Sequence, residues 1–288
     1  MRYRGVPAAA AGVGERLRST ALRTVFGGLK LVPAPLYDRI KRVPALRAPA
    51  RRLLDAALPT AGLSVATVEA GPIRGLRLEL QPRTNKDMAV GRYEPGLVEA
   101  LERMLQPGDI CFDVGAHLGY MSLVMASTVG PGGKVVAFEP DPGLFEMLRR
   151  NAARKHGALA PVVPVPAAAG ARSGRARFRH GESTGTGRLA DSGGGVTVRV
   201  VTLDDAVRRH GMPALVKLDV EGAEVEALLG STNILRRRDC TFIVEAHSHD
   251  LENRCRELLS GFDYEIDGLA PARDETVHLL ARPPRLGA

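Results

Sequence analysis

The sequence has no run of about 18 consecutive apolar residues, because Gly, Pro and charged residues interrupt its long apolar stretches. A transmembrane helix is therefore not expected. Its three cysteines, Cys111, Cys240 and Cys255, show no C-x-x-C spacing, which argues against a disulfide framework or a zinc site. No internal repeat of fixed period is present. We expect reduced, buried thiols in a cytoplasmic protein.

The first residues imitate a signal peptide, with Arg2 and Arg4 followed by Ala, Gly and Val. Ala and Gly form only a weak apolar region, and Glu15 ends it, so export is not expected. The whole chain is 44% hydrophobic and 25% charged, values typical of a soluble globular protein. A sizeable core is therefore expected.

Positive charge is concentrated at the N-terminus. Residues 1–60 contain 12 Lys and Arg against three acids, a balance of +9, and the whole chain is +8, so the remainder sums to −1. A nucleic-acid surface needs clustered basic residues, and the later part of the chain is not expected to provide one. The charge distribution limits the question of a basic partner site to the N-terminal arm.

The 288 residues suit one catalytic domain with an appendage. Residues 1–60 are predicted to be a basic, partly helical extension, because Pro33, Pro35 and Pro44 interrupt the helix-compatible segments Glu15–Leu31 and Ala45–Leu58. Either this arm is a solvated extension, or it rests on an anionic membrane or on the catalytic domain. Residues 61–288 are predicted to form the catalytic domain.

Short apolar strands alternate with helices from residue 110 onward, which implies right-handed crossovers and a parallel sheet. A β-hairpin and a helix are expected before this alternation begins. The expected elements up to residue 170 are a hairpin at Ser64–Leu80, a helix at Glu94–Leu105, a strand at Ile110–Val114, a helix at Tyr120–Thr128, a strand at Lys134–Phe138, a helix at Pro142–His156 and a strand at Pro161–Ala167.

A segment rich in Gly, Ser, Thr and Arg, Ala171–Gly195, predicts a hairpin with a loop before strand Val196–Val201, an insertion covering about residues 171–201. The alternation then resumes, and an antiparallel C-terminal pair closes the sheet. These later elements are helix Leu203–His210, strand Ala214–Val220, helix Ala223–Leu229, strand Thr241–Ala246, helix Leu251–Leu259 and the strand pair Tyr264–Ile266 and Val277–Ala281. The expected fold is α/β, with a doubly wound and mostly parallel sheet.

The strongest functional signal is Asp113-Val-Gly115-Ala-His-Leu-Gly119, where an apolar strand turns into a helix. There Gly115 would let a ligand approach the backbone, and Gly119 would permit tight packing. Asp113 suits a cationic amino group, directly or through water. Glu139 ends the next strand and can accept hydrogen bonds from two ribose hydroxyls. The pattern predicts a nucleoside site, and the absence of G-x-G-x-x-G disfavours a dinucleotide.

Four segments, in order, resemble the FkbM family of S-adenosylmethionine-dependent methyltransferases: Gly91–Pro95, Pro107–Tyr120, Phe138–Pro140 and Lys217–Glu224. The resemblance implies a class I methyltransferase (Rossmann-like) fold and methylation of a hydroxyl, typically on a sugar, glycolipid or secondary metabolite. His117 stands where the family often has Asn. We expect the cofactor S-adenosylmethionine to be bound by Tyr93, Glu94, Asp113, Gly115, Ala116, Gly119, Glu139 and Asp219.

Methyl transfer to an alcohol needs orientation and removal of the hydroxyl proton. Asp219, Glu245 and His247 are the candidates for this catalytic work, because each follows a strand that ends at the expected crevice. Glu221 and Glu224 add carboxylates there, with solvated helix-start acids as the alternative. If its strand stays extended, His249 shares a face with Glu245 and His247. A divalent cation could bind such groups, but no ligand set is assigned.

The remaining histidines, His156, His180, His210 and His278, show no partner pattern and are interpreted as surface or structural residues. Tyr93 could act as a lid over the cofactor, although simple packing explains it equally well. The segment Ser183–Gly187 could order over an acceptor, or be a linker.

Two other functions compete with methyl transfer. One is an NAD(P)-dependent oxidoreductase, disfavoured by the glycine spacing and by the lack of an evident Tyr/Lys or Ser/His catalytic pair. The other is a non-catalytic nucleoside-binding or scaffold domain, which the acids at Asp113, Glu139 and Asp219 argue against. The expected partner is a small-molecule or carbohydrate acceptor, without nucleic acid.

Overall fold

The computed structural model describes residues 62–154, 157–179, 188–190, 195–269 and 277–284, with three isolated positions before them. The chain divides into two units, Met1–Tyr93 and Glu94–Ala288. Within the described residues no helix has both the length and the apolarity needed to cross a bilayer. The predicted helical segments before residue 60, His156, His180 and Ser183–Gly187 lie outside the described residues.

The first unit contains an antiparallel hairpin and one short helix. Strand β1 (Ser64–Thr67) pairs with β2 (Arg77–Leu80), as the apolar pattern with intervening glycines predicts. Helix α4 (Lys86–Val90) follows and ends at Gly91, which has a φ of 75°. A Cβ at Gly91 would lie 2.0 Å from the carbonyl oxygen of Ala70, so only glycine allows this close approach.

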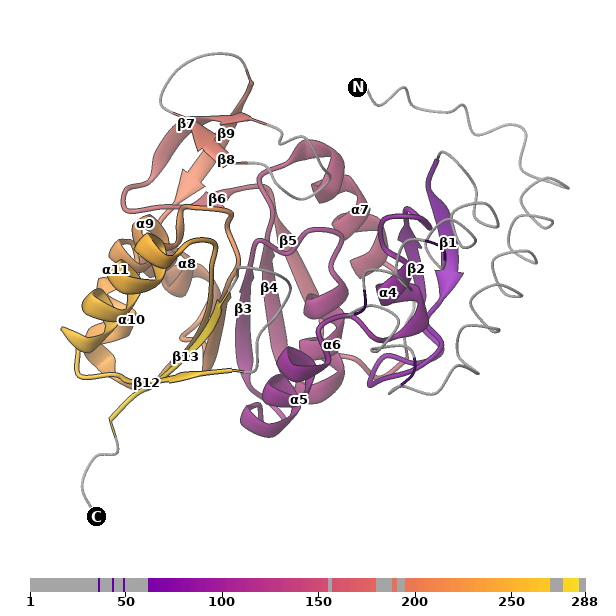
Figure 1. The fold of residues 1–288 in the computed structure, drawn as a ribbon, viewed down its shortest axis with the longest axis horizontal. Coiled ribbons are helices and arrows are strands. Elements are labelled where there is room, and N and C mark those ends of the chain that lie inside the picture. Colours follow the sequence, from indigo (N-terminus) through magenta and orange to yellow (C-terminus); the bar gives the residue numbers. More distant parts are fainter. Residues whose placement is uncertain are drawn as a thin grey trace, which may run out of the picture. The chain divides into compact units, whose positions relative to one another are not determined.

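The second unit is built on a seven-stranded sheet with the order β12-β13-β11-β10-β3-β4-β5 (Figure 1). The five strands from β11 to β5 are parallel, and β13 pairs antiparallel with both β11 and β12. The predicted α/β, mostly parallel fold is confirmed. Its strands are β3 (Ile110–Val114), β4 (Lys134–Phe138), β5 (Val162–Val165), β10 (Leu215–Leu218), β11 (Thr241–Ala246), β12 (Glu265–Gly268) and β13 (Val277–Arg282).

Two groups of helices cover the two faces of this sheet (Figure 1). One group is α5 (Pro95–Met104), α6 (Tyr120–Val129) and α7 (Pro142–Ala152), and the other is α8 (Leu203–His210), α9 (Glu224–Leu229), α10 (Thr232–Arg237) and α11 (His249–Ser260). The even-numbered strand residues, such as Phe112, Phe138 and Phe242, form one core cluster with α8–α11. Because side chains alternate along a strand, odd-numbered residues face the other helix group.

The insertion forms a separate four-stranded sheet of order β6-β9-β7-β8. Its strands are β6 (Ala168–Ala169), β7 (Gly174–Arg179), β8 (Arg188–Ala190) and β9 (Val196–Val201). The sequence predicted one strand at Pro161–Ala167, but β5 ends at Val165 and β6 joins the second sheet. Pro166 lies between them, and proline has no N–H to continue a ladder.

Candidate functional site

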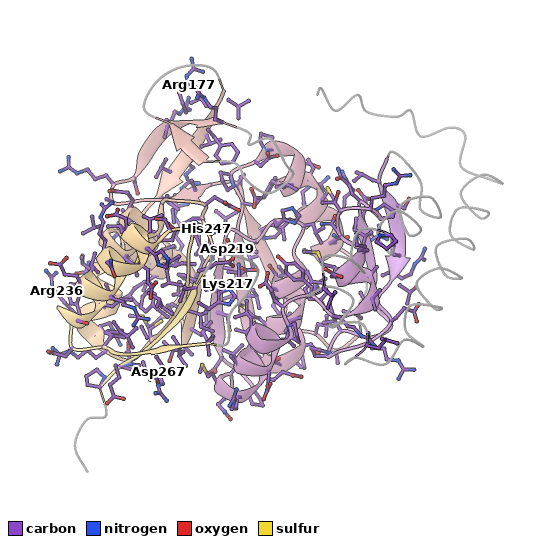
Figure 2. All side chains as sticks on the ribbon, in the orientation of Figure 1. Arg177, Lys217, Asp219, Arg236, His247 and Asp267 are labelled. Carbon is purple, nitrogen blue, oxygen red and sulfur yellow. The ribbon has the colours of Figure 1, made fainter. Side chains whose placement is uncertain are left out.

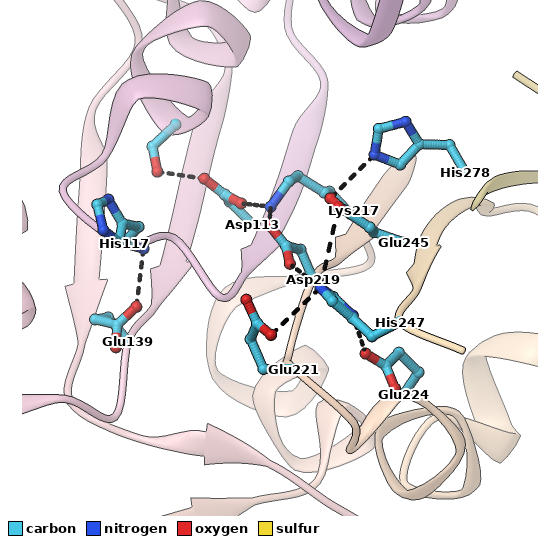
Figure 3. A network of polar contacts seen from close by, with 11 residues as sticks. Asp113, His117, Glu139, Lys217, Asp219, Glu221, Glu224, Glu245, His247 and His278 are labelled. Atoms are coloured by element: carbon cyan, nitrogen blue, oxygen red, sulfur yellow. Dashed lines mark hydrogen bonds and ion pairs between the residues drawn. The ribbon is translucent and has the colours of Figure 1, made fainter. Parts of the chain in front are cut away.

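Charged side chains converge at the carboxyl ends of the parallel strands (Figure 3). Asp113 on β3 and Lys217 on β10 are direct partners in the strand register, and Glu245 on β11 shares their odd-numbered face. Figure 2 shows Lys217, Asp219 and His247 in the middle of the second unit, while Arg236 lies at its periphery. The sheet thus gathers residues that are more than 100 positions apart in the sequence.

Asp113 is fully buried and has partners inside the protein. Its Oδ2 accepts a hydrogen bond from Ser122 Oγ on α6 at 2.6 Å, and its Oδ1 lies 3.3 Å from Lys217 Nζ. The sequence predicts a contact of this carboxylate with the cofactor, directly or through water, but a side chain without exposed surface cannot touch a ligand in this conformation. We correct its role to holding Lys217, which sequence reasoning missed.

Lys217 bridges two carboxylates at the centre of the site. The residue is only 4% exposed, and Nζ lies 3.3 Å from carboxylate oxygens of both Asp113 and Asp219. Burial alone would lower the pKa of Lys217, but the charges of Asp219 and Asp113 outweigh burial and raise this pKa. The ammonium is therefore charged at neutral pH. The sequence signal that could have revealed this role is a lysine inside the otherwise apolar strand β10.

Gly115 brings the two strand ends together. Its φ is 81°, and a Cβ there would lie 1.7 Å from the carbonyl oxygen of Asp219. The sequence predicts close approach by a ligand at this glycine, and the structure shows close approach by the carbonyl of Asp219, directly after β10. The amides of Gly115 and Ala116 both donate to the carbonyl of Phe138.

Glu139 is positioned by two backbone amides at the end of β4. Its Oε2 accepts from His117 N at 2.8 Å and its Oε1 from Asp141 N at 2.9 Å, and the residue is 5% exposed. Burial raises the pKa of Glu139 to about 8, although both hydrogen bonds act in the opposite direction. Asp141 also caps α7 by accepting from Gly143 N. The carboxyl group is thus fixed in place by the turn.

The turn between β3 and α6 has a strained residue at its centre. His117 has a φ of 53°, a left-handed conformation in which Asn, Asp and His are enriched. This preference explains why His can replace the Asn typical of the resemblance. Burial lowers the pKa of His117 to about 4, so the imidazole is neutral. At the helix start, a Cβ on Gly119 would lie 2.7 Å from Leu148 Cδ1, so this glycine allows close packing against helix α7.

His247 lies among four carboxylates at the ends of β10 and β11. Its Nδ1 is 2.7 Å from Glu224 Oε1, whereas its Nε2 is 3.5 Å from Asp219 Oδ1, 3.6 Å from Glu221 Oε2 and 4.0 Å from Glu245 Oε1. Burial would lower the pKa of His247, but the hydrogen bond with Glu224 and the surrounding negative charges raise it to about 9.

Glu245 has a second histidine partner on the neighbouring strand. His278 Nε2 lies 3.0 Å from Glu245 Oε2, and the two residues are register partners of β13 and β11. Burial would raise the pKa of Glu245, but His278 outweighs it and lowers this pKa to about 2. His278 is buried and belongs to the cluster. The sequence shows no partner pattern around His278, so this role was not predicted.

The structure does not bring His249 to the site. Strand β11 ends at Ala246, so the extended alternation stops, and His249 is the first residue of α11 with an 88% exposed side chain. Glu94 precedes α5 with a φ of 43°, and its carboxylate lies within 4.8 Å of ligand atoms of Glu245 and His278. Tyr93 ends the first unit, and its contact with a cofactor stays a prediction.

Comparisons with known proteins include one family model that covers more than half of the chain. Residues 113–266 match the model of the methyltransferase FkbM domain. The chain is 29% identical to the hexuronic acid methyltransferase AglP of Haloferax volcanii, over 64% of this chain and 75% of that protein. It is 31% identical to the 31-O-demethyl-FK506 methyltransferase FkbM of Streptomyces tacrolimicus, over 51% of this chain and 68% of that protein.

One solved structure, the methyltransferase FkbM from Methylobacillus flagellatus, aligns with a TM-score of 0.46 and 16% identity. The alignment covers 64% of this chain and 50% of that chain.

Proposed function

Because this chain belongs to the FkbM family of methyltransferases, we propose that it transfers a methyl group from S-adenosylmethionine to a hydroxyl of a sugar, glycolipid or secondary metabolite. The name of one relative supports a hydroxyl acceptor, since it acts on 31-O-demethyl-FK506. The name of the other supports a sugar, since it acts on a hexuronic acid, which carries both hydroxyls and a carboxyl group. We therefore propose that the acceptor of this chain is likewise a sugar, a glycolipid or a secondary metabolite.

The arrangement of Glu139 carries the proposal. A carboxyl group at the end of the second parallel strand, held by two backbone amides, can accept hydrogen bonds from both hydroxyls of a ribose. The glycine turn after β3 lies beside it, since His117 from this turn donates to Glu139. We place the nucleoside of the cofactor here, with Ala116 and Gly119 shaping the turn and Asp219 and Glu94 beyond it.

The acceptor then lies over the ends of β10 and β11. Its hydroxyl oxygen attacks the methyl carbon in line, the carbon–sulfur bond breaks, and the sulfonium becomes a neutral thioether while the hydroxyl proton passes to a base. Lys217 already holds Asp219 and His278 already holds Glu245. Glu221, whose side chain is 30% exposed and faces His247, is the carboxylate best placed to take the proton.

Ligand-induced stabilisation tests the cofactor assignment. S-adenosylmethionine and its demethylated product should both raise the melting temperature of the full chain, because a ligand that binds only the native state stabilises it. Glu139→Ala should remove most of this shift. Glu146→Ala, an exposed glutamate on α7, is the matched control and should keep it. If NAD raises the melting temperature and neither sulfur nucleoside does, the chain is an oxidoreductase instead.

Transfer of a labelled methyl group tests the acceptor class. The chain should label small molecules that carry the hydroxyls of a hexuronic acid or of 31-O-demethyl-FK506, and it should fail to label versions in which the hydroxyl is already methylated. A chain that binds the cofactor firmly and labels no small molecule in a lysate extract would be a scaffold rather than an enzyme.

The basic arm is a separate proposal, since residues 1–60 lie outside the described residues apart from three isolated positions. We propose that it contacts anionic membrane surfaces through its surplus of nine positive charges. Vesicles containing an anionic lipid should retain the full chain better than a chain that starts near Ala61. Equal retention of both chains would contradict the contact.

A further inference from the structure

We propose that Asp219, Glu245 and His247 form a binding site for one divalent cation of the Mn²⁺ type, at the carboxyl ends of β10 and β11. The site is defined by contacts in the second unit alone. Only the role of the cation in methyl transfer rests on the proposed function.

The spacing of the three side chains suits a shared cation. One ligand atom from each residue lies within 4.8 Å of the others. His247 Nε2 is 3.5 Å from Asp219 Oδ1 and 4.0 Å from Glu245 Oε1, which is too long for hydrogen bonds. Two ligands of one ion, each about 2.1 Å from it, lie roughly 3 to 4 Å apart. The observed distances therefore match ligands that share an ion.

Each proposed ligand residue has a second polar atom that does not face the cation, and a residue outside the set contacts that second atom (Figure 3). Glu224 contacts His247 Nδ1 at 2.7 Å, His278 contacts Glu245 Oε2 at 3.0 Å, and Lys217 contacts Asp219 Oδ2 at 3.3 Å. The three remaining atoms, His247 Nε2, Glu245 Oε1 and Asp219 Oδ1, face one another. A second layer that orients each first-layer ligand is characteristic of metal sites.

The second layer is itself buried, which separates this site from an ordinary surface cluster of acids. Glu224 is fully buried, Lys217 is 4% exposed and His278 is 2% exposed. Glu224 Oε2 has no hydrogen-bond partner among the described residues, although burying an unsatisfied carboxylate oxygen is costly. This cost is offset if the other oxygen, Oε1, makes a needed contact, and here Oε1 orients the imidazole of His247.

Charge balance favours a cation. Four carboxylates surround His247, and among the described residues they are offset by Lys217, which is shared with Asp113, and by His247 itself. Buried negative charges that are not compensated cost several kcal/mol each, on the order of magnitude known for buried ions. A divalent cation between Asp219 and Glu245 would offset this cost.

The ligand types indicate which cation fits. Two carboxylate oxygens and one imidazole nitrogen suit Mn²⁺ better than Mg²⁺, which prefers oxygen ligands alone. Soft thiolate ligands are absent from the set, since Cys111, Cys240 and Cys255 are buried elsewhere. The open positions of the ion would take oxygens of the acceptor and lower the pKa of its hydroxyl, and Glu221 would then take the proton.

Direct cation binding tests the site without any substrate. The full chain is treated with chelator, dialysed and titrated with Mn²⁺, and free Mn²⁺ is followed by electron paramagnetic resonance. One Mn²⁺ per chain should bind. Glu245→Gln and His247→Gln should each weaken binding at least tenfold, while Glu146→Gln on α7 should leave it unchanged. Circular dichroism shows whether each variant is folded.

The second layer gives an independent variant. Glu224→Gln keeps the ligands but weakens the hold on the imidazole, so Mn²⁺ affinity should fall by about tenfold. The inference is overturned if the wild-type chain binds no Mn²⁺ below about 1 mM, or if the variants bind it as the wild type does. The melting shift with S-adenosylmethionine is measured on the same samples. A normal melting shift without Mn²⁺ binding would overturn the cation site and leave the proposed function intact. Mn²⁺ binding without a melting shift would support the cation site and contradict the proposed function.

Discussion

The two halves of the site differ in how far their polar groups are already satisfied. At the ends of β3 and β4, the carboxyl oxygens of Glu139 and Asp113 Oδ2 accept hydrogen bonds of 2.6 to 2.9 Å from the protein. At the ends of β10 and β11, His247 Nε2 faces three carboxylates at 3.5 to 4.0 Å without a hydrogen bond. In the first half most carboxyl oxygens are satisfied by the protein, although Asp113 Oδ1 and His117 Nδ1 have no hydrogen-bond partner among the described residues. In the second half His247 Nε2 is held by longer, purely electrostatic contacts.

The most damaging change we expect is Gly115→Ala, because this glycine joins the two halves. The new Cβ would lie 1.7 Å from the Asp219 carbonyl oxygen, and the φ of 81° is itself unfavourable for alanine. The free energy of unfolding should fall by about 3 kcal/mol or more. Gly108→Ala is the matched control, with a φ of 93° and nothing within 4 Å, and should cost only about 1 to 2 kcal/mol. Urea unfolding compares the two, and equal losses would contradict the close approach.

The next largest effect concerns Lys217, which bridges the halves electrostatically. Lys217→Met leaves the buried Asp113 and the half-buried Asp219 beside each other without the ammonium, and should destabilise the chain by about 3 kcal/mol. Adding Asp113→Asn removes one of the stranded charges and should restore part of the loss. Urea unfolding of the four proteins of this double-mutant cycle measures the coupling. Strictly additive losses of unfolding free energy would mean that Lys217 and Asp113 do not stabilise the fold through their interaction.

Glu221→Gln should separate the halves by function. The variant loses a base but keeps the β3–β4 half, so kcat should fall by about a hundredfold while the affinity for S-adenosylmethionine stays the same. Single-turnover methyl transfer and isothermal titration calorimetry measure the two quantities. A loss of cofactor affinity in this variant would show that the halves are not independent.

The smallest effect is a pH dependence of cofactor affinity from the first half. Burial raises the pKa of Glu139 to about 8, so the free carboxyl group is mostly protonated at neutral pH. If the bound ribose stabilises the ionised form, affinity rises with pH up to about 8, by at most about tenfold per unit, and then levels off. Calorimetry from pH 6 to 9 measures it. The Glu139→Gln variant has no ionisable group at this position, so its affinity for S-adenosylmethionine should not show this rise with pH.

The central strands were predictable because they are buried on both faces. Apolar runs such as Ile110–Val114, Lys134–Phe138 and Thr241–Ala246 were predicted with their observed ends, since helices cover both sides of a parallel sheet. The short helices α4 and α10, of five and six residues, were missed. Helices this short show the period of 3.6 over only one or two turns, so their prediction is uneven, and α9, also six residues long, was predicted at Ala223–Leu229.

The partners of the site residues were less predictable than the residues themselves. Asp113, Glu139, Asp219, Glu245 and His247 were all singled out, because each is polar and directly follows or ends an apolar strand. Their contacts depend on strand order, which places Lys217 beside Asp113 and His278 beside Glu245. Neither neighbour is near its partner in the sequence, so no local pattern could reveal it.

By itself, the sequence determined the alternation of strands and helices, the polar residues at the strand ends and the resemblance to one family, because these depend on periodicity and local spacing. Only the tertiary structure decided that Asp113 turns inward, that His249 lies outside the site, and that three ligand atoms converge between β10 and β11. The reason is physical: which oxygen of a carboxylate is held and which is open depends on side chains from neighbouring strands, and these meet only when the sheet forms.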